Sequence, residues 1–130
     1  MIVVDSCALV DLALGAEALG TWVAEQLVET EGLAAPHVLD VEVLGACRSL
    51  AYRGVVTPVA ARTALDAVSL MPLARYPHPP LHERMWELRH QLSAADAAYV
   101  ALAEALAAPL VTTDLRLSRA HGTDCEILAP

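Results

Sequence analysis

Short apolar runs alternate with longer amphipathic segments along this chain of 130 residues. The apolar runs are rich in β-branched or small residues, and they predict strands over residues 2–4, 33–35, 71–75, 110–112 and 125–128. Between the runs, apolar positions recur at a helical spacing, which predicts helices over residues 8–14, 16–31, 36–52, 58–69, 81–91, 93–106 and 115–120. Strands that alternate with helices in this way are typical of a parallel sheet.

This order of elements predicts an α/β fold. Short strands made almost entirely of apolar residues are buried on both faces, so we expect a short, mostly parallel β-sheet flanked by helices on both faces. The length suits one domain over residues 1–130 with a sizeable core. No repeat, linker or low-complexity segment divides the chain.

Prolines and hydroxyl residues mark where several helices begin. Pro36 is expected in the first turn of the helix that follows the second strand. Thr57 and Pro58 form an N-cap and first-turn pair, and Ser93 with Asp96 resembles a capping box. The prolines at positions 77, 79 and 80 predict a loop.

The apolar content is high and has two explanations. Hydrophobic residues make up 56% of the chain, and one explanation is that the surplus is buried against a second chain. The many alanines, which bring little surface, explain the same number without a partner. Trp22 and Trp86 fit either the core or such an interface. Acidic residues and Pro109 interrupt the apolar runs, and the N-terminus does not resemble a signal peptide, so no membrane attachment is expected.

Cysteines and charge limit the class of protein further. Cys7, Cys47 and Cys125 are odd in number and lack CxxC spacing, which favours reduced thiols in a cytoplasmic protein. The net charge of −8 argues against simple electrostatic capture of nucleic acid. All eight basic residues are arginines, whose planar guanidinium groups suit phosphate and carboxylate.

Four carboxylates stand at element ends, where parallel sheets bind their ligands. Asp5 and Asp114 each directly follow a predicted strand, and Glu42 lies in the first two turns of the helix after the second strand. Asp96 lies in the first turn of the helix that precedes the strand over residues 110–112. Strand C-termini and helix N-termini share an edge in this architecture, so all four acids are expected to converge there.

Converged carboxylates repel one another by roughly 4 kcal/mol per pair at about 4 Å and an effective dielectric of about 20. They therefore need protonation or a cation, and the hard divalent ions Mg²⁺ and Mn²⁺ fit a site made of oxygen ligands. One or two such ions can polarise a phosphate, generate hydroxide and stabilise the leaving oxygen. The acidic cluster thus favours phosphodiester hydrolysis.

Each acid also has a purely structural interpretation. Asp5 and Asp114 suit helix N-caps. Asp96 can complete the capping box with Ser93, and Glu42 can stabilise the positive end of a helix dipole. It is their joint placement at one edge that favours the metal site.

Three stretches of the chain resemble the PIN-domain family, specifically the VapC-like ribonuclease toxins of type II toxin–antitoxin modules. They are MIVVDSCALVDL at the N-terminus, PHVLDVEVLGACR in the middle and LSAADAAYVALAEALAAPLVTTDLRL near the C-terminus. The resemblance extends over nearly the whole chain. It is most specific over residues 92–117, where acid, helix, proline, strand, threonine and acid follow at the family's spacing.

This resemblance implies an Mg²⁺- or Mn²⁺-dependent endoribonuclease. Its acidic quartet of metal ligands maps onto Asp5, Glu42, Asp96 and Asp114, and Thr112 would orient metal-bound water or the acidic ligands. The resemblance also implies a homodimer and a VapB-like antitoxin whose C-terminal segment fills the active-site groove. The implied substrate is a structured RNA, such as transfer RNA.

Two positions depart from the family pattern or add to it. Cys7 stands where family members often have a small hydroxyl residue, which changes the hydrogen bonds around the metal ligands. Asp40 is an extra acid near Glu42, but residues two apart on a helix do not share a face. We therefore interpret Asp40 as a helix-dipole or surface acid.

Three arginines are candidate contacts to RNA phosphates. Arg116 and Arg119 closely follow Asp114, and Arg48 lies on the same predicted helix as Glu42. For each of them, a surface position beside acidic neighbours is the alternative.

Other classes of function fit parts of the same pattern. A receiver or phospho-aspartyl domain is also small, acidic and Mg²⁺-binding, but it needs a lysine, and the chain has none. A non-catalytic PIN scaffold is favoured by an incomplete quartet, whereas the quartet here is complete. A housekeeping PIN-type ribonuclease stays open as an alternative.

Overall fold

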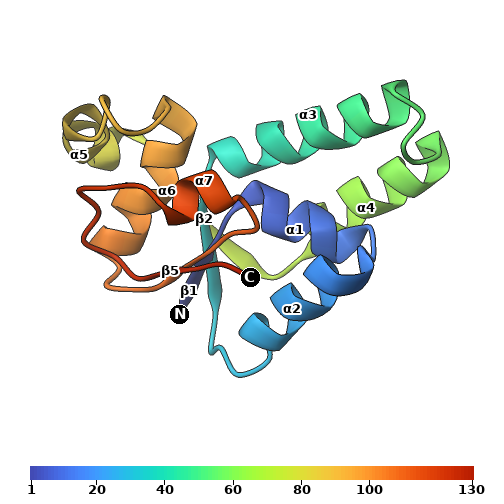
Figure 1. The fold of residues 1–130 in the computed structure, drawn as a ribbon, viewed down its shortest axis with the longest axis horizontal. Helices are drawn as coiled ribbons and strands as arrows, with labels where there is room; N and C mark the ends of the chain where they lie inside the picture. Colours follow the sequence, from blue (N-terminus) through green and yellow to red (C-terminus); the bar gives the residue numbers. More distant parts are fainter.

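Five short strands pair in parallel to form a single sheet in the computed structural model, which describes residues 1–130. The strands are β1 (Ile2–Val4), β2 (Leu33–Pro36), β3 (Leu73–Tyr76), β4 (Leu110–Val111) and β5 (Ile127–Leu128). Their order across the sheet is β3-β2-β1-β4-β5, with β1 in the centre (Figure 1). The expected parallel sheet is therefore confirmed.

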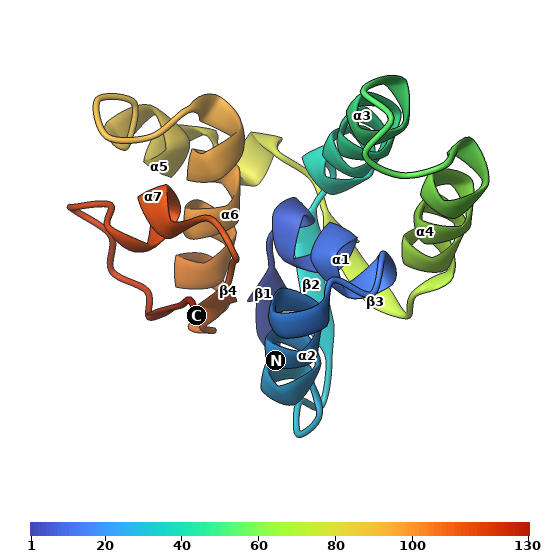
Figure 2. The same ribbon diagram turned by 45° about the vertical axis from the view of Figure 1, so that its right-hand side comes forward.

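Seven α-helices and one 3₁₀ turn cover this sheet. They are α1 (Ser6–Ala13), α2 (Glu17–Leu27), α3 (Val38–Tyr52), α4 (Pro58–Leu70), the 3₁₀ turn (Pro79–Leu81), α5 (His82–Glu87), α6 (Ala94–Ala105) and α7 (Leu115–Ser118). Figure 2 shows α5 and α6 on one side of β1 and β2, and α1, α3 and α4 on the other. The prediction of helices on both faces is confirmed.

Helix α6 is the most deeply buried helix of the fold. Every residue from 97 to 103 is buried, and the helix packs against β1, β2 and β4. A helix that is apolar all round is expected where it has protein on every side. This burial explains why the chain uses alanine, valine and leucine here with so little polar interruption.

The strand order creates a topological switch beside β1. From β1 the chain moves outward to β2 and β3, and it then returns to β4 on the opposite side of β1. The pairing continues one residue past β1, because the Asp5 N–H donates to the Val111 carbonyl oxygen at 2.9 Å. In such sheets ligands bind at the carboxyl ends of the strands, at the switch point. Asp5 and the residues after Val111 occupy that place.

Pro36 is not in the first helical turn, as the sequence predicted, but is the last residue of β2. It lies opposite Tyr76 of β3 in the register of the sheet. The neighbouring strand β1 has already ended at this level, so the missing N–H of proline breaks no hydrogen bond of the sheet. Helix α3 consequently begins two residues later, at Val38.

Two predicted helices are also shorter than expected. Helix α2 ends at Leu27 rather than near Glu31, and a turn follows in which the Thr30 hydroxyl donates to the Gly32 carbonyl. The segment predicted as one helix over residues 81–91 contains α5 and then tight turns. One of them is closed by a hydrogen bond from the Arg89 N–H to the Trp86 carbonyl oxygen.

Helices α1 and α2 form a sharply bent pair. No single helix is long and apolar enough to cross a membrane; α1 and α2 together reach the required length and composition, with a bend of 113° between them. At their junction Gly20 is buried. A Cβ atom at this position would lie 2.9 Å from the Asp11 carbonyl oxygen. Glycine is therefore what lets the two helix backbones approach.

Replacing Gly20 with alanine is expected to destabilise the protein by about 1–3 kcal/mol, because the added methyl group overpacks a backbone contact. The matched control is Gly45→Ala in the exposed part of α3, where nothing lies within 4 Å of the new Cβ. That change is expected to stabilise by up to about 1 kcal/mol through helix propensity. Urea denaturation measures the free energy of unfolding of both variants. Equal effects of the two changes would contradict the close approach of α1 and α2 at Gly20.

Candidate active site

Asp5 stands at the end of β1 with 5% of its surface exposed. Its carboxylate accepts hydrogen bonds from Thr112 Oγ1 at 2.7 Å, from Cys7 Sγ at 3.0 Å and from Ser6 Oγ at 3.3 Å. It occupies the N-cap position of α1 but makes no side-chain capping bond. Asp5 is thus the N-cap of α1 by position, but its side-chain oxygens bind side chains of α1 and of the segment after β4 and not the helix backbone.

Thr112 connects two of the predicted acidic residues. It is fully buried directly after β4. Its hydroxyl donates to Asp5 Oδ2 and accepts a hydrogen bond from the Asp114 backbone N–H at 3.0 Å. One side chain therefore sets both the orientation of the Asp5 carboxylate and the path of the backbone that carries Asp114.

Asp96 is brought to the same edge by the first turn of α6. The helix is capped by Ser93, whose Oγ accepts from the Asp96 N–H at 3.2 Å. This hydrogen bond is the Ser93 half of the predicted capping box, and it uses the backbone of Asp96, not its carboxylate. Burial raises the pKa of the Asp96 carboxyl, as do the charges of Asp5 and Asp114, against the lowering effects of Ser93 and Arg116.

Glu42 projects from α3 toward the same group of acids. Tyr99, buried in the second turn of α6, donates its hydroxyl to Glu42 Oε1 at 2.8 Å. Burial raises the pKa of the Glu42 carboxyl, and the charges of Asp5 and Asp96 raise it further, while the Tyr99 hydrogen bond lowers it. The site therefore holds negative charge that the surrounding protein only partly compensates.

Asp114 begins α7 and is paired with a cation of its own. Its carboxylate accepts from the Arg116 N–H at 2.8 Å and forms an ion pair with the Arg116 guanidinium at 2.6 Å. The guanidinium holds the pKa of Asp114 below its usual range. Asp114 is therefore the N-cap of α7, which is the alternative that the sequence left open for it. It also lies near enough to Asp96 for its charge to raise the pKa of that residue.

A cavity of about 390 Å³ opens in front of Glu42 and Asp96, whereas Asp5 and Asp114 do not line it. Its walls are Glu42, Gln91, Leu92, Ser93, Asp96, Arg116 and Leu117. The sequence reasoning singled out neither Gln91 nor Leu92 as a site residue. One feature of the sequence could have indicated them: both residues directly precede Ser93, the N-cap of the helix that carries Asp96.

The charges of Asp5 and Asp96 raise the pKa of Glu42, and those of Asp5 and Asp114 raise the pKa of Asp96, so neighbouring pairs of the four acids interact. No group of three or more His, Cys, Asp and Glu side chains is arranged to hold a metal ion, however. Carboxylate oxygens that compete for too little positive charge are the donor set that a hard divalent cation prefers. The four carboxylates thus suit a divalent cation chemically. In this structure, however, Tyr99 binds Glu42 and Arg116 binds Asp114. The metal role of the quartet therefore stays a prediction.

Cys7 supports the site through its thiol proton. Burial and the neighbouring Asp5 charge raise the pKa of the Cys7 thiol to about 11, so the group remains a protonated donor to Asp5. Asp40 lies outside the cavity and forms an ion pair with Arg75 at 2.7 Å, which ties the first turn of α3 to β3.

Of the three arginines expected to contact RNA, only Arg116 lines the cavity. Arg48 lies over the Tyr52 ring, with its guanidinium carbon 5.9 Å from the ring centre. Arg119 closes the short helix α7. Contacts of Arg48 and Arg119 with RNA stay predictions.

Comparison with known proteins identifies the class to which this fold and site belong. The pattern of the PIN domain matches residues 2–122, and the chain belongs to the PIN-domain family. Within that family it is 44% identical to the VapC ribonuclease Mb0985 of Mycobacterium bovis over 127 residues, which cover 98% of this chain and 96% of that protein.

Two solved structures resemble the fold closely. PAE2754 from Pyrobaculum aerophilum shares 29% identity with a TM-score of 0.72, covering 97% of this chain and 81% of that one. VapBC2 from Rickettsia felis, bound to a DNA fragment from its promoter, shares 16% identity with a TM-score of 0.71, covering 100% and 99%. The PIN fold predicted from the three sequence stretches is thus confirmed.

Proposed function

We propose that this protein is a metal-dependent endoribonuclease and the toxin of a toxin–antitoxin pair. The observation that carries the proposal is the pair Glu42 and Asp96. These two carboxylates come from different helices, have raised pKa values and line one cavity at the switch point of the sheet. Near-full-length identity of 44% to a VapC ribonuclease supports the reaction type.

The proposed ligands for one or two Mg²⁺ or Mn²⁺ ions are Asp5, Glu42, Asp96 and Asp114. When bound, such ions supply Lewis acidity at a phosphate and lower the pKa of water. Thr112 then keeps the buried Asp5 carboxylate oriented toward the site through its 2.7 Å hydrogen bond. In the same way, Tyr99 fixes Glu42 against the wall formed by α6.

Arg116 has a separate proposed role in binding substrate. Its side chain is 85% exposed, so it can leave Asp114 at little packing cost when a stronger cation arrives. The guanidinium is then free at the cavity mouth, where it can form two hydrogen bonds with an RNA phosphate. Arg116 would thus alternate between neutralising the empty site and holding the substrate.

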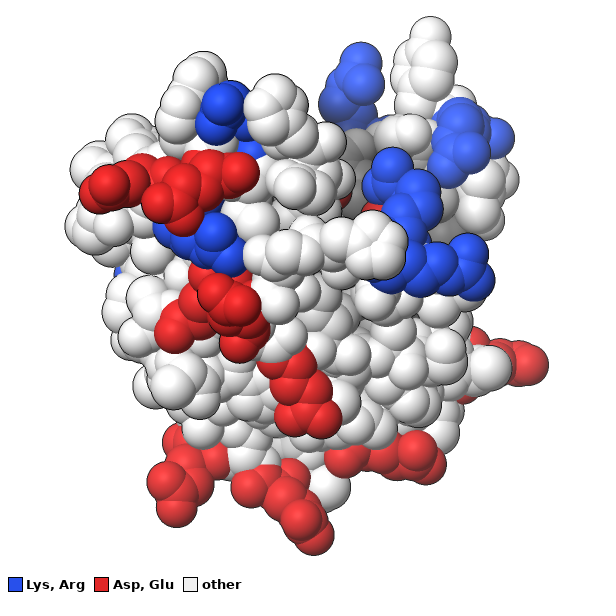
Figure 3. Space-filling view, turned by 60° about the vertical axis from the view of Figure 1, so that its left-hand side comes forward, with Lys and Arg blue, Asp and Glu red and all other residues white.

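The distribution of charge supports RNA binding by a chain whose net charge is −8. On the face shown in Figure 3, basic side chains lie in the upper part on both sides of a hollow, most of them on the right, while acidic side chains lie at the upper left, down the left-hand side and along the lower edge. Local charge near the binding surface governs attraction of a phosphate backbone more than the total does. Structured RNA, with transfer RNA as the first class to test, is the proposed substrate.

Exposed apolar side chains support the proposed protein partners. Val41, Leu44 and Tyr52 lie along α3 and are 70%, 52% and 86% exposed. A stripe of this kind suits burial against another chain. We propose a homodimer and a VapB-like antitoxin as the partners; the solved VapBC2 assembly from R. felis supports the second.

Purified total transfer RNA incubated with this protein and Mg²⁺ or Mn²⁺ is expected to yield discrete fragments on a denaturing gel. Excess chelator should abolish cleavage, and restoring the ion should recover it, because the carboxylates alone provide no Lewis acid. Isothermal titration of the ion into RNA-free protein is the parallel measurement. Folded protein that neither binds the ions nor cuts RNA would contradict the nuclease and leave a non-catalytic PIN scaffold.

A further inference from the structure

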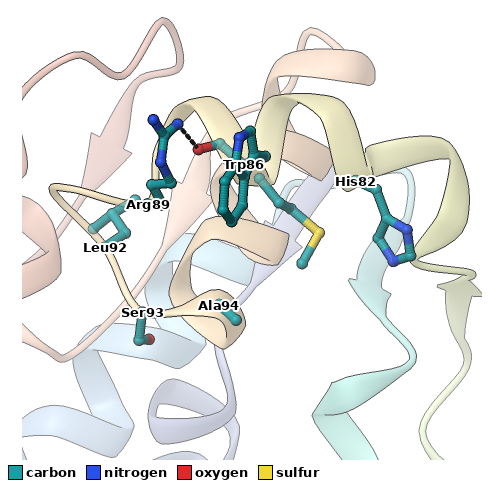
Figure 4. Close-up of a pocket in the computed structure, with 7 residues that line it drawn as sticks. His82, Trp86, Arg89, Leu92, Ser93 and Ala94 are labelled. Carbon is teal, nitrogen blue, oxygen red and sulfur yellow. Dashed lines mark hydrogen bonds between the residues drawn. The ribbon is translucent and has the colours of Figure 1, made fainter.

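A second cavity, of about 600 Å³, lies between α5 and the start of α6. Its walls include His82, Met85, Trp86, Arg89, Leu92 and Ser93. Figure 4 shows that the side chains of His82, Trp86 and Arg89 come from α5 and the turn after it, with Ser93 and Ala94 across the opening. Nothing in the proposed chemistry uses this cavity.

Trp86 is the unusual member of this cavity because it is 69% exposed. The Arg89 guanidinium carbon lies 4.5 Å from the centre of its ring, and Arg89 Nη1 donates to the Trp86 carbonyl oxygen at 2.8 Å. Arginine and tryptophan are thus held together as an aromatic surface with a positive charge beside it. A large aromatic ring left in water at a cavity is a binding feature more than a packing one.

The two cavities are neighbours. Leu92 and Ser93 line both the acidic cavity and the one that contains Trp86. A ligand whose phosphate lies at Asp96 and Arg116 therefore meets the Trp86 cavity on the far side of Ser93. Besides the metal ions, the proposed function places an RNA chain in the acidic cavity, and such a chain is long enough to extend into the neighbouring one.

We propose that the Trp86 cavity binds an unpaired nucleobase of the RNA, next to the phosphate that is cut. The inference rests on the proposed function and extends it to substrate recognition. Trp86 provides the stacking surface, since bases of every kind stack on aromatic rings. Arg89 contributes positive charge beside the stacked base, and His82 provides a polar group at the wall. A base can reach such a cavity only when it is unpaired, so the site selects loops and single strands.

Binding of a short, random-sequence, fluorescein-labelled single-stranded RNA tests this site. Ca²⁺ replaces Mg²⁺ to slow cleavage, and fluorescence anisotropy together with tryptophan emission is recorded. The RNA is expected to quench the emission of the wild-type protein. Trp86→Ala should raise Kd at least about 5-fold, as for the loss of one stacked base, whereas Trp86→Phe should stay within about 3-fold because it keeps an aromatic face.

Two controls separate base stacking from general effects. Leu70→Ala removes an exposed apolar side chain at the end of α4, which does not line the cavity, and should leave both readouts unchanged. An RNA of the same length with abasic nucleotides should bind the wild type and Trp86→Ala equally.

The proposed base site would be wrong if RNA did not quench the wild-type emission, or if Trp86→Ala and the wild type bound RNA with equal affinity. If RNA was still cleaved in that case, the proposed nuclease activity would stand. Quenching by RNA without any metal-dependent cleavage would support the base site and contradict the nuclease. A third outcome is loss of a wild-type dimer in Trp86→Ala, seen by sedimentation, with RNA binding unchanged. That outcome would assign the cavity to a second copy of the chain and overturn the proposal.

Discussion

Replacing Asp96 with asparagine is expected to reduce RNA cleavage at least about 100-fold, since metal-ion stabilisation of a phosphate transition state is worth several kcal/mol. The change removes one charge from the cavity wall and keeps the shape of the side chain. The N-terminus of α6 stays capped, because the capping hydrogen bond runs from the backbone N–H of residue 96 to Ser93 Oγ. Activity should therefore be lost without loss of the fold.

The same variant should be as stable as the wild type, or more stable, at neutral pH without metal. The pKa of Asp96 is raised in the folded protein above its ordinary value of 3.8. The unfolded chain therefore loses this proton first as the pH rises, and stability falls as the pH passes through the folded pKa. Asparagine carries no charge, so the variant does not lose this stability as the pH rises. Its stability advantage should disappear below pH 3.8, where both states are protonated.

Metal ions should reverse this order of stability. Mg²⁺ or Mn²⁺ is expected to raise the Tm of the wild type, since it binds only the folded state, and to raise that of Asp96→Asn much less. Asp66→Asn is the matched control, because Asp66 lies on α4 in an exposed ion pair with Arg62 at 2.9 Å. An Asp96→Asn protein that cuts RNA at the wild-type rate would remove Asp96 from the proposed metal site.

Replacing Thr112 with valine is expected to lower both activity and stability. Valine has nearly the same shape but cannot donate to Asp5 Oδ2 or accept from the Asp114 N–H, the two shorter of the bonds that the Thr112 hydroxyl makes, at 2.7 and 3.0 Å. Loss of a buried hydrogen bond to a charged group costs about 1.5–3 kcal/mol. Misorientation of a metal ligand by loss of its supporting group costs about 10- to 100-fold in activity or metal affinity.

Thr112→Ser separates the hydroxyl from the methyl group. Serine restores the hydrogen bonds and leaves a small void, so it should recover most of the activity while some stability is still lost. Cleavage rates and urea denaturation of the two variants give the comparison. Activity lost equally in Thr112→Ser and Thr112→Val would show that packing matters, and the orienting role of the hydroxyl would be wrong.

Much of the fold could be predicted from local patterns. The apolar run before Asp5 and the caps Thr57 and Ser93 correctly indicated a strand and two helix starts, because these features depend on residues near in sequence. Pro36 was misassigned because its backbone state depends on pairing with Tyr76, 40 positions away. The end of the helix predicted to reach residue 91 was also missed, since the turns there serve the packing of α5 beside α6.

The site shows the same division between local and tertiary information. By itself, the sequence determined which side chains carry the carboxylates and that they follow strands or begin helices, because element ends follow from local propensity and capping. Only the tertiary structure decided the distant partners of those side chains: Thr112 on Asp5 and Tyr99 on Glu42. It also decided that the Trp86 cavity adjoins the acidic one at Ser93. Such contacts depend on how α3 and α6 lie against the sheet, and no local pattern in the chain carries that geometry.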